Sequence, residues 1–273
     1  MTETTRTGGC CVTHPGGVVE LCLWSVIGGR RIMPCRAYWV EGLLVDTCHA
    51  RGKRAFAAWA ASRLISGAVL THHHEDHAGN AALLNSRGIP VLAHPAAAAL
   101  MDRPLPIFER VVWGAPEPAA TKPAPACIEA GKRRLKVVET PGHTPDHIAL
   151  LEENEGWLFA GDLYLADRLV YLHRDEDLGL MLASLEKVLR LDFSVLFCAH
   201  RGRVADGRMM LAAKRNFLLE LVERVHDLSR AGYGEKEITG LVLGREGLLT
   251  WVSRGLFSKR RLVHRILHPG SAG

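Results

Sequence analysis

The 273-residue sequence contains no hydrophobic run long enough to cross a membrane. Its longest apolar stretch, residues 18–29, is interrupted by Glu20 and is shorter than the ~20 residues that a spanning helix needs. The first residues, MTETTRTGG, also lack the apolar core of a secretory signal. We therefore expect a protein that has no membrane partner and resides in the cytoplasm.

Paired cysteine motifs are absent as well. The seven cysteines are an odd number and include no C-x-x-C pair. A chain of this length can bury a sufficient core without disulfides, so we interpret the cysteines as reduced, small apolar side chains. Repeats and low-complexity tracts are also missing, and 48% hydrophobic with 23% charged residues is an ordinary globular composition. This composition excludes a fibrous or disordered protein.

The sequence has only a small excess of charge of one sign, and that excess is unevenly placed. The net charge is +5. Residues 1–200 hold 20 Lys and Arg against 22 Asp and Glu, whereas residues 201–273 hold 14 against 7. The basic excess therefore belongs to the end of the chain, and it gives no reason to expect an anionic partner for the rest.

Short apolar runs alternate with helical patterns from residue 18 onward. This alternation is typical of an α/β architecture, in which helices cover the faces of a sheet. The predicted strands are residues 18–27, 37–45, 67–71, 89–93, 135–139, 147–151, 157–160 and 194–199. The predicted helices are residues 55–65, 78–86, 178–189 and 207–228.

Two segments differ from this alternation. Residues 104–125 hold six of the thirteen prolines and show no clear period, so we predict a loop that borders the active site. After Arg201 the pattern becomes wholly helical, and we expect short helices at residues 235–243, 248–255 and 258–267. The predicted organisation is an N-terminal lead-in at residues 1–17, a main domain at residues 18–205 and a helical C-terminal extension at residues 206–273.

A cluster of metal-ligand residues follows the predicted strand at residues 67–71. The sequence there reads HHHEDH, starting at His72. Alternate residues of an extended segment point the same way, so the side chains of His72 and His74 can coordinate the same cation. Asp76 and His77 lie where the chain turns into the next helix and can face a second cation. Imidazole and carboxylate are ligands that suit zinc.

Three further motifs place a histidine or an aspartate close to the end of an apolar strand. PGHTPDH contains His143, FAGD ends in Asp162, and FCAH ends in His200. In α/β folds the loops gather at the carboxyl ends of strands to form sites. Upstream, LLVDT places Asp46 in a similar position. Together these elements make a chance cluster of histidines a poor explanation.

The order H-x-H-x-D-H, G-H-T, G-D and a late histidine resembles the metallo-β-lactamase superfamily. LLVDT resembles the first motif of that family, an apolar strand that ends in aspartate. The resemblance covers roughly residues 18–205. It implies a four-layer αββα sandwich of mixed α and β structure, with metals at one edge of two facing sheets. The small helical C-terminal region only loosely resembles the winged-helix-like region that some members carry.

The resemblance assigns metal-binding roles to seven residues. One metal ion would be held by His72, His74 and His143. A second would be held by Asp76, His77 and His200, with Asp162 bridging the two. Because all seven are present, we expect two metal ions per chain, with Zn2+ as the first choice and iron or manganese as alternatives.

The same resemblance implies a hydrolytic mechanism. Two metals ~3.5–4 Å apart lower the pKa of bound water, and the bridging hydroxide attacks a carbonyl. Asp76 would orient this nucleophile and take its proton. Tyr164, two residues after Asp162, would donate to the developing oxyanion, unless it is an ordinary core residue. Asp46 is expected to orient a ligating histidine, and Cys48 stands where a glycine usually follows Asp-Thr.

Residues beside the ligands have structural expectations. His73 and Glu75 should point away from the metals, toward solvent or sheet-edge groups. Asp146 and His147 should hydrogen-bond within their loop rather than act in catalysis. His173 is expected either at the edge of the pocket or in a structural role.

Three functions are compatible with these residues. The leading hypothesis is a hydrolase of small esters, thioesters or lactones, with a small molecule as the partner. The second is a nuclease acting on RNA or other phosphodiesters, assisted by basic residues of the extension, namely Arg254, Lys259, Arg260, Arg261 and Arg265. The same residues suit the solvated face of a helix that caps the main domain, so nucleic acid is not the favoured partner. The third is a mononuclear iron sulfur dioxygenase, and the oligomeric state stays open.

Overall fold

The computed structural model describes residues 2–4 and 9–270, and the chain divides into two compact units. The first unit comprises Met1–Glu139, Asp146–Leu165 and Asp192–Gly207. The second comprises Thr140–Pro145, Ala166–Leu191 and Arg208–Gly273. The predicted boundary between a main domain and an extension at residues 205 and 206 stays a prediction.

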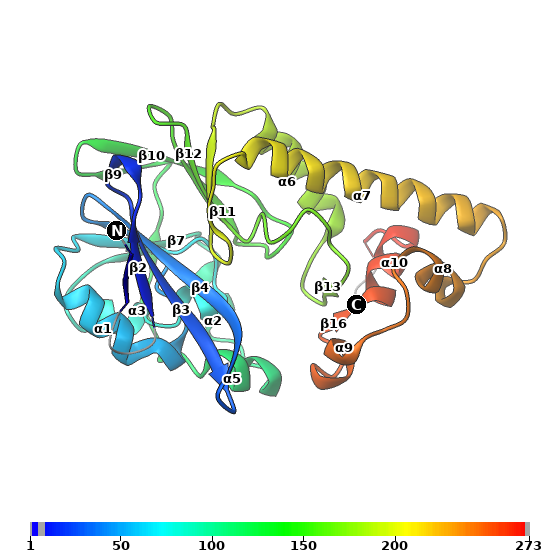
Figure 1. The fold of residues 1–273 in the computed structure, drawn as a ribbon, viewed down its shortest axis with the longest axis horizontal. Helices are drawn as coiled ribbons and strands as arrows, with labels where there is room; N and C mark the ends of the chain where they lie inside the picture. Colours follow the sequence, from blue (N-terminus) through cyan, green and yellow to red (C-terminus); the bar gives the residue numbers. More distant parts are fainter. Residues whose placement is uncertain (1, 5–8, 271–273) are drawn as a thin grey trace. The chain divides into compact units, whose positions relative to one another are not determined.

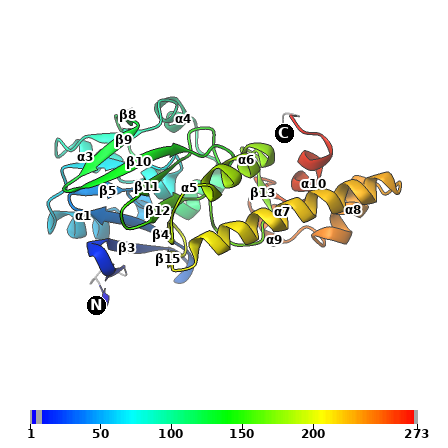
Figure 2. The ribbon, with the colours of Figure 1, turned by 90° about the horizontal axis from the view of Figure 1, so that it is seen from above.

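Two β-sheets make up most of the first unit (Figures 1 and 2). The first sheet contains, in spatial order, β1 (Thr2–Thr4), β2 (Cys10–Thr13), β3 (Val19–Ile27), β4 (Arg30–Val40), β5 (Leu43–Val45), β6 (Gly67–Val69), β7 (Val91–Ala93) and β8 (Lys122–Pro123). The second contains β15 (Gly202–Val204), β14 (Val195–Cys198), β12 (Trp157–Gly161), β11 (Ile148–Glu152), β10 (Arg133–Glu139) and β9 (Cys127–Ala130). Strands β5 to β8 run parallel, as do β12 and β14.

The two sheets of the first unit share one buried apolar cluster. Val45 and Val69 of the first sheet pack in it with Leu150, Phe159 and Phe197 of the second. The short helices of this unit are α1 (Lys53–Ala61), α2 (Glu75–Ala78), α3 (Ala81–Asn85), α4 (Ala97–Met101) and α5 (Ile107–Trp113), with 3-10 turns at Pro15–Gly17 and Ala50–Gly52. Helices α1, α3 and α4 contribute to a separate apolar cluster with the first sheet. The result is a layered arrangement of helices on sheet on sheet.

The second unit is mainly helical. Its elements are β13 (Leu172–His173), α6 (Leu178–Leu189), nearly all of α7 (Gly207–Arg230), α8 (Glu235–Val242), α9 (Leu248–Val252), β16 (Phe257–Ser258) and α10 (Lys259–Leu267). Strands β13 and β16 pair antiparallel, and α10 packs against α6, α8 and β13 with Leu262 and Val263 buried. The long helix α7 is plain in Figure 2. Among the described residues, no helix is both long and apolar enough to span a bilayer.

Most predicted elements are confirmed within a few residues, and α6 coincides with its predicted range. The single strand predicted at residues 37–45 is wrong, because it is the end of β4 and the whole of β5. Glu41 and Gly42 turn the chain between them with positive φ values of 44° and 100°. Glycine adopts such values without strain, and the apolar run on both sides concealed the turn.

The single helix predicted at residues 78–86 is also wrong, because two short helices, α2 and α3, occupy this segment. At Gly79 a Cβ atom would lie 2.5 Å from the Ala50 nitrogen and 2.6 Å from the Cys48 oxygen, so only glycine allows this approach of two backbones. The Asn80 side chain then donates to the carbonyl oxygens of Thr47 and Cys48, at 2.7 and 3.3 Å. These contacts fix the segment after β6 against the segment after β5.

The expectations for the proline-rich segment and the C-terminal region need correction. Residues 104–125 are not a simple loop, because they contain α5 and β8. Val112 of α5 is buried, and its carbonyl accepts a hydrogen bond from the Ser25 hydroxyl, which anchors the helix. The chain after Arg201 is not wholly helical, because it contributes β15 and β16. Strand β15 forms an antiparallel hairpin with β14, and β16 pairs with the distant strand β13. These strands are only two or three residues long, so the helical pattern around them concealed them.

Candidate metal centre

Four strand ends position the candidate ligands of the first unit. Asp46 follows β5 directly, and the segment from His72 to His77 follows β6, its parallel neighbour. Asp162 follows β12, and His200 comes two residues after β14, the parallel neighbour of β12. Parallel strands end at the same edge of a sheet, and this brings the side chains of each pair together.

Two carboxylates and two imidazoles converge at this edge. The Nε2 atoms of His77 and His200 each lie 3.3 Å from Oδ1 of Asp162. Asp76 Oδ2 lies 3.2 Å from His200 Nε2 and 3.8 Å from His77 Nε2. None of the four residues is more than 7% exposed. A buried set of nitrogen and oxygen donors at such short separations fits a zinc-type ion.

Asp46 determines the orientation of His77. Its Oδ2 atom accepts a hydrogen bond from His77 Nδ1 at 2.8 Å, because a carboxylate can only accept. Its Oδ1 accepts from the backbone nitrogen of Thr71 at 2.7 Å. With the proton fixed on Nδ1, Nε2 of His77 is the nitrogen that faces Asp162. The geometry matches the supporting role that the sequence predicted for Asp46.

His200 is held by a buried network that sequence reasoning missed. Its Nδ1 donates to the carbonyl of Pro34 at 2.6 Å. Its own carbonyl accepts from Arg36, and the Arg36 Nε atom donates to Glu20 at 2.6 Å. Glu20 in turn lies 2.8 Å from His14. Arg36 and His200 are 164 residues apart in the sequence, so no local signal could have revealed this support.

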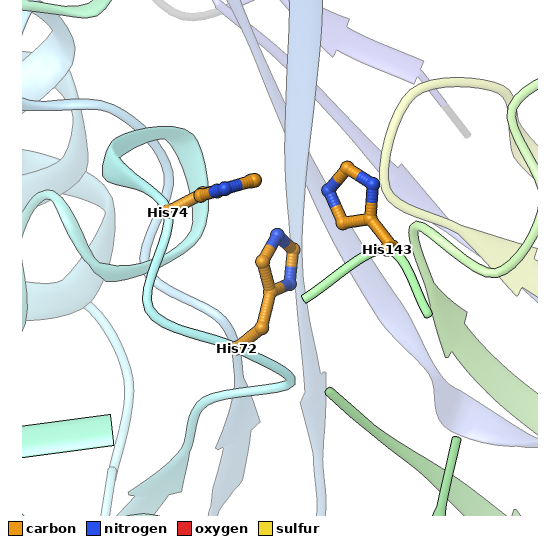
Figure 3. A group of neighbouring side chains, drawn as sticks. All are labelled: His72, His74 and His143. Atoms are coloured by element: carbon orange, nitrogen blue, oxygen red, sulfur yellow. The ribbon is translucent and has the colours of Figure 1, made fainter. Parts of the chain in front are cut away.

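A second group of candidate ligands consists of His72, His74 and His143. Their ring nitrogens lie within 4.8 Å of one another, and Figure 3 shows the three rings turned toward a common centre. His72 also lies within the same limit of His77 and Asp162. Every one of the seven predicted ligands therefore belongs to one of these neighbouring groups. Within the second unit, His143 Nδ1 lies 2.8 Å from Oε1 of Glu176, an acceptor that the sequence did not single out.

Burial and charge act on the pKa values of this centre in opposite directions. Burial disfavours the charged form of His77, but the carboxylates of Asp46, Asp162 and Asp76 outweigh it and raise the pKa well above its usual value. Burial is outweighed in the same way at His200, where Asp162 and Asp76 raise the pKa. Burial also disfavours ionised Asp162 and Asp76, yet the two neighbouring imidazoles lower both carboxyl pKa values. Without metal, the imidazoles therefore retain protons that a metal ion must displace.

The neighbours of the ligands take structural positions. Asp146 Oδ1 lies 2.8 Å from His73 Nδ1, and His147 Nε2 accepts a hydrogen bond from the backbone nitrogen of Asp162 at 3.0 Å. Both residues form hydrogen bonds, as predicted, but these partners lie outside their own loop. Cys48 adopts a φ of 56°, so this position keeps the conformation that glycine favours.

Of the two surroundings expected for Glu75, solvent or sheet-edge groups, burial excludes solvent. Glu75 is 5% exposed and, with His73, lines a cavity of about 220 Å³ beside the proline-rich segment. Burial and the nearby Glu109 raise the pKa of its carboxyl to about 8. The sequence around it is polar, so only the tertiary structure reveals its burial.

The two remaining predicted residues are buried. Tyr164 is 2% exposed, and its backbone carbonyl accepts a hydrogen bond from Cys198 Sγ at 2.8 Å. Its role as a donor to an oxyanion stays a prediction. His173 lies in β13 of the second unit, with its ring centroid 4.9 Å from that of Phe257. This packing gives His173 a structural environment.

Comparisons with known proteins agree with the fold. A family model described as the metallo-beta-lactamase superfamily matches residues 33–200. A solved metallo-beta-lactamase family protein from Thermus thermophilus superposes with a TM-score of 0.64 at 20% identity, covering 91% of this chain and 92% of that one. A metallo-beta-lactamase from Pontibacter korlensis gives 0.61 at 19% identity, covering 80% and 99%. These similarities show a shared fold and confirm the layered α and β architecture expected from the sequence.

Curated relatives are similar over part of their length. A hydroxyacylglutathione hydrolase from Cupriavidus taiwanensis is 37% identical over 164 residues, which are 57% of this chain and 58% of that protein. An atrochrysone carboxyl ACP thioesterase from Paecilomyces divaricatus is 31% identical over 170 residues, or 58% of this chain and 46% of that protein. The chain thus spans about half the length of the curated relatives it matches.

Proposed function

This chain belongs to the metallo-beta-lactamase superfamily, and from that premise we propose that it is a hydrolase that binds two zinc ions and cleaves small thioesters. The observation that carries the proposal is the way the histidines are held. The Nδ1 atoms of His77, His143 and His200 each lie 2.6–2.8 Å from a carboxylate or carbonyl oxygen. This arrangement is typical of metal-binding histidines, because it fixes the tautomer and the direction of Nε2.

The proposed ligand sets follow the two groups of neighbouring donors. We assign one ion to His72, His74 and His143. We assign the other to Asp76, His77 and His200, with Asp162 shared between them. The proximity of His72, His77 and Asp162 supports this sharing. The imidazole-rich donors favour zinc over manganese, which suits oxygen-rich sites better.

The proposed reaction is attack of water on the thioester carbonyl, which forms a C–O bond and breaks the C–S bond. The products are a carboxylic acid and a thiol, and the proton taken from water passes to the leaving sulfur. Zinc in such a centre supplies a nucleophile from water at neutral pH and polarises the substrate carbonyl. Asp76, whose lowered pKa keeps it ionised, orients the attacking water and accepts its proton on a carboxylate oxygen. Asp46 keeps the His77 proton on Nδ1, and the bond from the Asp162 backbone to His147 positions Asp162. Tyr164 is the proposed donor to the oxyanion.

The thioester class rests on the relatives. One is named for the hydrolysis of hydroxyacylglutathione and another as an ACP thioesterase. A nuclease is less well supported, because phosphate contacts need free cations and basic groups of α10 are engaged within their own unit. Lys259 Nζ donates to the Leu243 carbonyl at 2.7 Å. Arg260 and Arg261 likewise bond to Glu235 and to the Gly255 carbonyl, at 2.5 and 2.8 Å. We therefore favour a small-molecule partner.

The proposal extends to the organisation of the chain. We propose that residues 18–205 carry the hydrolase centre and that residues 206–273 act as a helical cap. All seven cysteines are unpaired, which accords with the cytoplasmic location that we propose.

The test compares substrates and one variant. Zinc-loaded protein should hydrolyse small acyl thioesters, measured by release of the free thiol, and should leave RNA and phosphodiesters intact. Asp162→Asn should lose metal and at least about a hundredfold of the thioesterase rate, because the shared ligand also anchors two imidazoles. Asp167→Asn, outside the proposed site, is the matched control. Thioesterase activity that stays at the wild-type level after measured metal loss would contradict the ligand assignment.

A further inference from the structure

We propose that the second unit contains an additional site for a divalent transition-metal ion, formed by Glu235 of α8, His264 of α10 and His268, the residue that directly follows α10. One ligand atom from each of these residues lies within 4.8 Å of the others. The site is separate from the candidate hydrolytic centre and independent of the proposed function. Two imidazoles and one carboxylate are a donor set that suits Zn2+, and copper or nickel as well.

The two histidines lie four residues apart at the C-terminal end of α10. The backbone nitrogen of His268 donates to the His264 carbonyl at 2.8 Å and closes the last helical turn, while His268 itself has non-helical φ and ψ values of −131° and 68°. Their ring centroids lie 4.8 Å apart. Side chains at this spacing lie one above the other on a helix, and two histidines so placed can chelate one metal ion.

The carboxylate comes from the neighbouring helix. Glu235 is the first residue of α8, and its Oε2 lies 2.9 Å from His264 Nδ1. Ligands that share a tetrahedral zinc at bonds of ~2.0–2.1 Å lie about 3.3 Å apart. The Glu235–His264 pair is thus close to this separation, and all three donor atoms lie within 4.8 Å of one another. His268 is the one exposed ligand, so it can adjust by side-chain rotation. The fourth position would remain open to water.

The two carboxylate oxygens of Glu235 have different partners. Arg260 Nε donates to Oε1 at 2.5 Å, whereas Oε2 faces the histidines. Glu235 therefore offers one oxygen to an ion while the other stays paired. The positive charge of Arg260 repels the metal ion, so we expect that removing the Arg260 side chain tightens metal binding at this site.

The consequence for the fold is a metal link between α8 and α10. The two helices already pack against each other within the second unit. An ion held by ligands from both would restrict their separation and stabilise this unit against unfolding. The hydrolytic rate should be unaffected, because none of the three residues belongs to the proposed centre.

In the experiment, the full chain is first loaded with the zinc that the proposed hydrolytic centre binds tightly. It is then titrated with Zn2+ alone. Wild-type protein should bind one further equivalent in isothermal titration. His268→Ala and His264→Ala should weaken this step about tenfold or more, because each removes one of three ligands. His226→Ala, a histidine of α7 outside the cluster, is the matched control and should bind like wild type. Arg260→Ala should bind more tightly than wild type.

The outcomes distinguish this site from zinc binding elsewhere on the chain. Circular dichroism shows whether each variant is folded. A further variant, Glu235→Gln, removes the carboxylate while nearly preserving its shape. A wild-type isotherm with no additional equivalent overturns the proposal. So does an additional equivalent that His264→Ala, His268→Ala and Glu235→Gln all retain at wild-type affinity, because the ion would then have other ligands.

Discussion

Replacing Asp46 by asparagine isolates the role of one hydrogen bond in the candidate metal centre. Asp46 accepts from His77 Nδ1 at 2.8 Å and from the Thr71 backbone at 2.7 Å, and it is 2% exposed. Asparagine has nearly the same shape and tolerates the positive φ of 60° at this position. The substitution therefore removes charge and acceptor capacity with little disturbance of the backbone.

The expected magnitude follows from the tautomer of His77. Asparagine retains one oxygen, which the Thr71 nitrogen occupies, so its amide group would face His77 Nδ1. That amide donates, and it favours the tautomer with the proton on Nε2, the nitrogen that faces Asp162. Loss of such a supporting acceptor costs roughly 10–100-fold in metal affinity. This corresponds to about 1.4–2.7 kcal/mol.

The assay is a competition titration of zinc against a chromophoric chelator, with the thioesterase rate measured alongside. Asp146→Asn is the matched control, because Asp146 makes the same 2.8 Å contact to the Nδ1 of a histidine, His73, that is not a proposed ligand. The control should keep its zinc affinity. Equal affinities for wild type and Asp46→Asn, or a greater loss in the control, would refute the reasoning.

Three further predictions concern single residues. Gly161→Ala should destabilise the protein by roughly 1–3 kcal/mol in urea unfolding and should also weaken metal binding, because a Cβ atom there would lie 2.7 Å from His147 Nε2. The control variant Gly29→Ala, where φ is also positive at 77° but the space is open, should lose less stability. Metal-free Glu75→Gln should gain stability over wild type as the pH rises from 5 to 8. The pKa of about 8 in the folded state lies above the ordinary value of 4.5, so the wild-type protein loses stability as Glu75 is forced to ionise. A stability difference between Glu75→Gln and wild type that does not change with pH would count against this reasoning. Glu246→Gln should destabilise the protein at pH 7 by roughly 1–2 kcal/mol, through lost hydrogen bonds to the start of α10. Because the folded pKa is lowered to about 2, thermal unfolding should show this difference above pH 4.5 and lose it toward pH 2.

The clustering of the candidate ligands could be predicted because their spacing is local. His72, His74, Asp76 and His77 lie within six residues after one apolar strand, and the strands before Asp162 and His200 are equally short and apolar. The apolar pattern of each strand and the position of the polar residue after it are then enough to place that side chain at a strand end. The same reasoning predicted α6 to the residue, since its apolar period is regular and Asp177 caps it.

The groups that orient the candidate ligands could not be predicted in the same way. Glu176 lies 33 residues from His143, and Arg36 lies 164 residues from His200. Such pairings depend on how distant segments pack, and the sequence around a single charged residue does not identify its partner. Helix α5 was missed because the prolines on both sides dominate its short apolar pattern, and the break at Gly79 became visible only as a close approach of two backbones.

The most direct test of the proposed dinuclear thioesterase is the rate of thioester hydrolysis as zinc is returned to fully chelated protein. The rate should be negligible without metal and should rise until two tightly bound equivalents per chain are present. A full rate in the metal-free protein, or no thioester hydrolysis at any zinc content, would contradict the account.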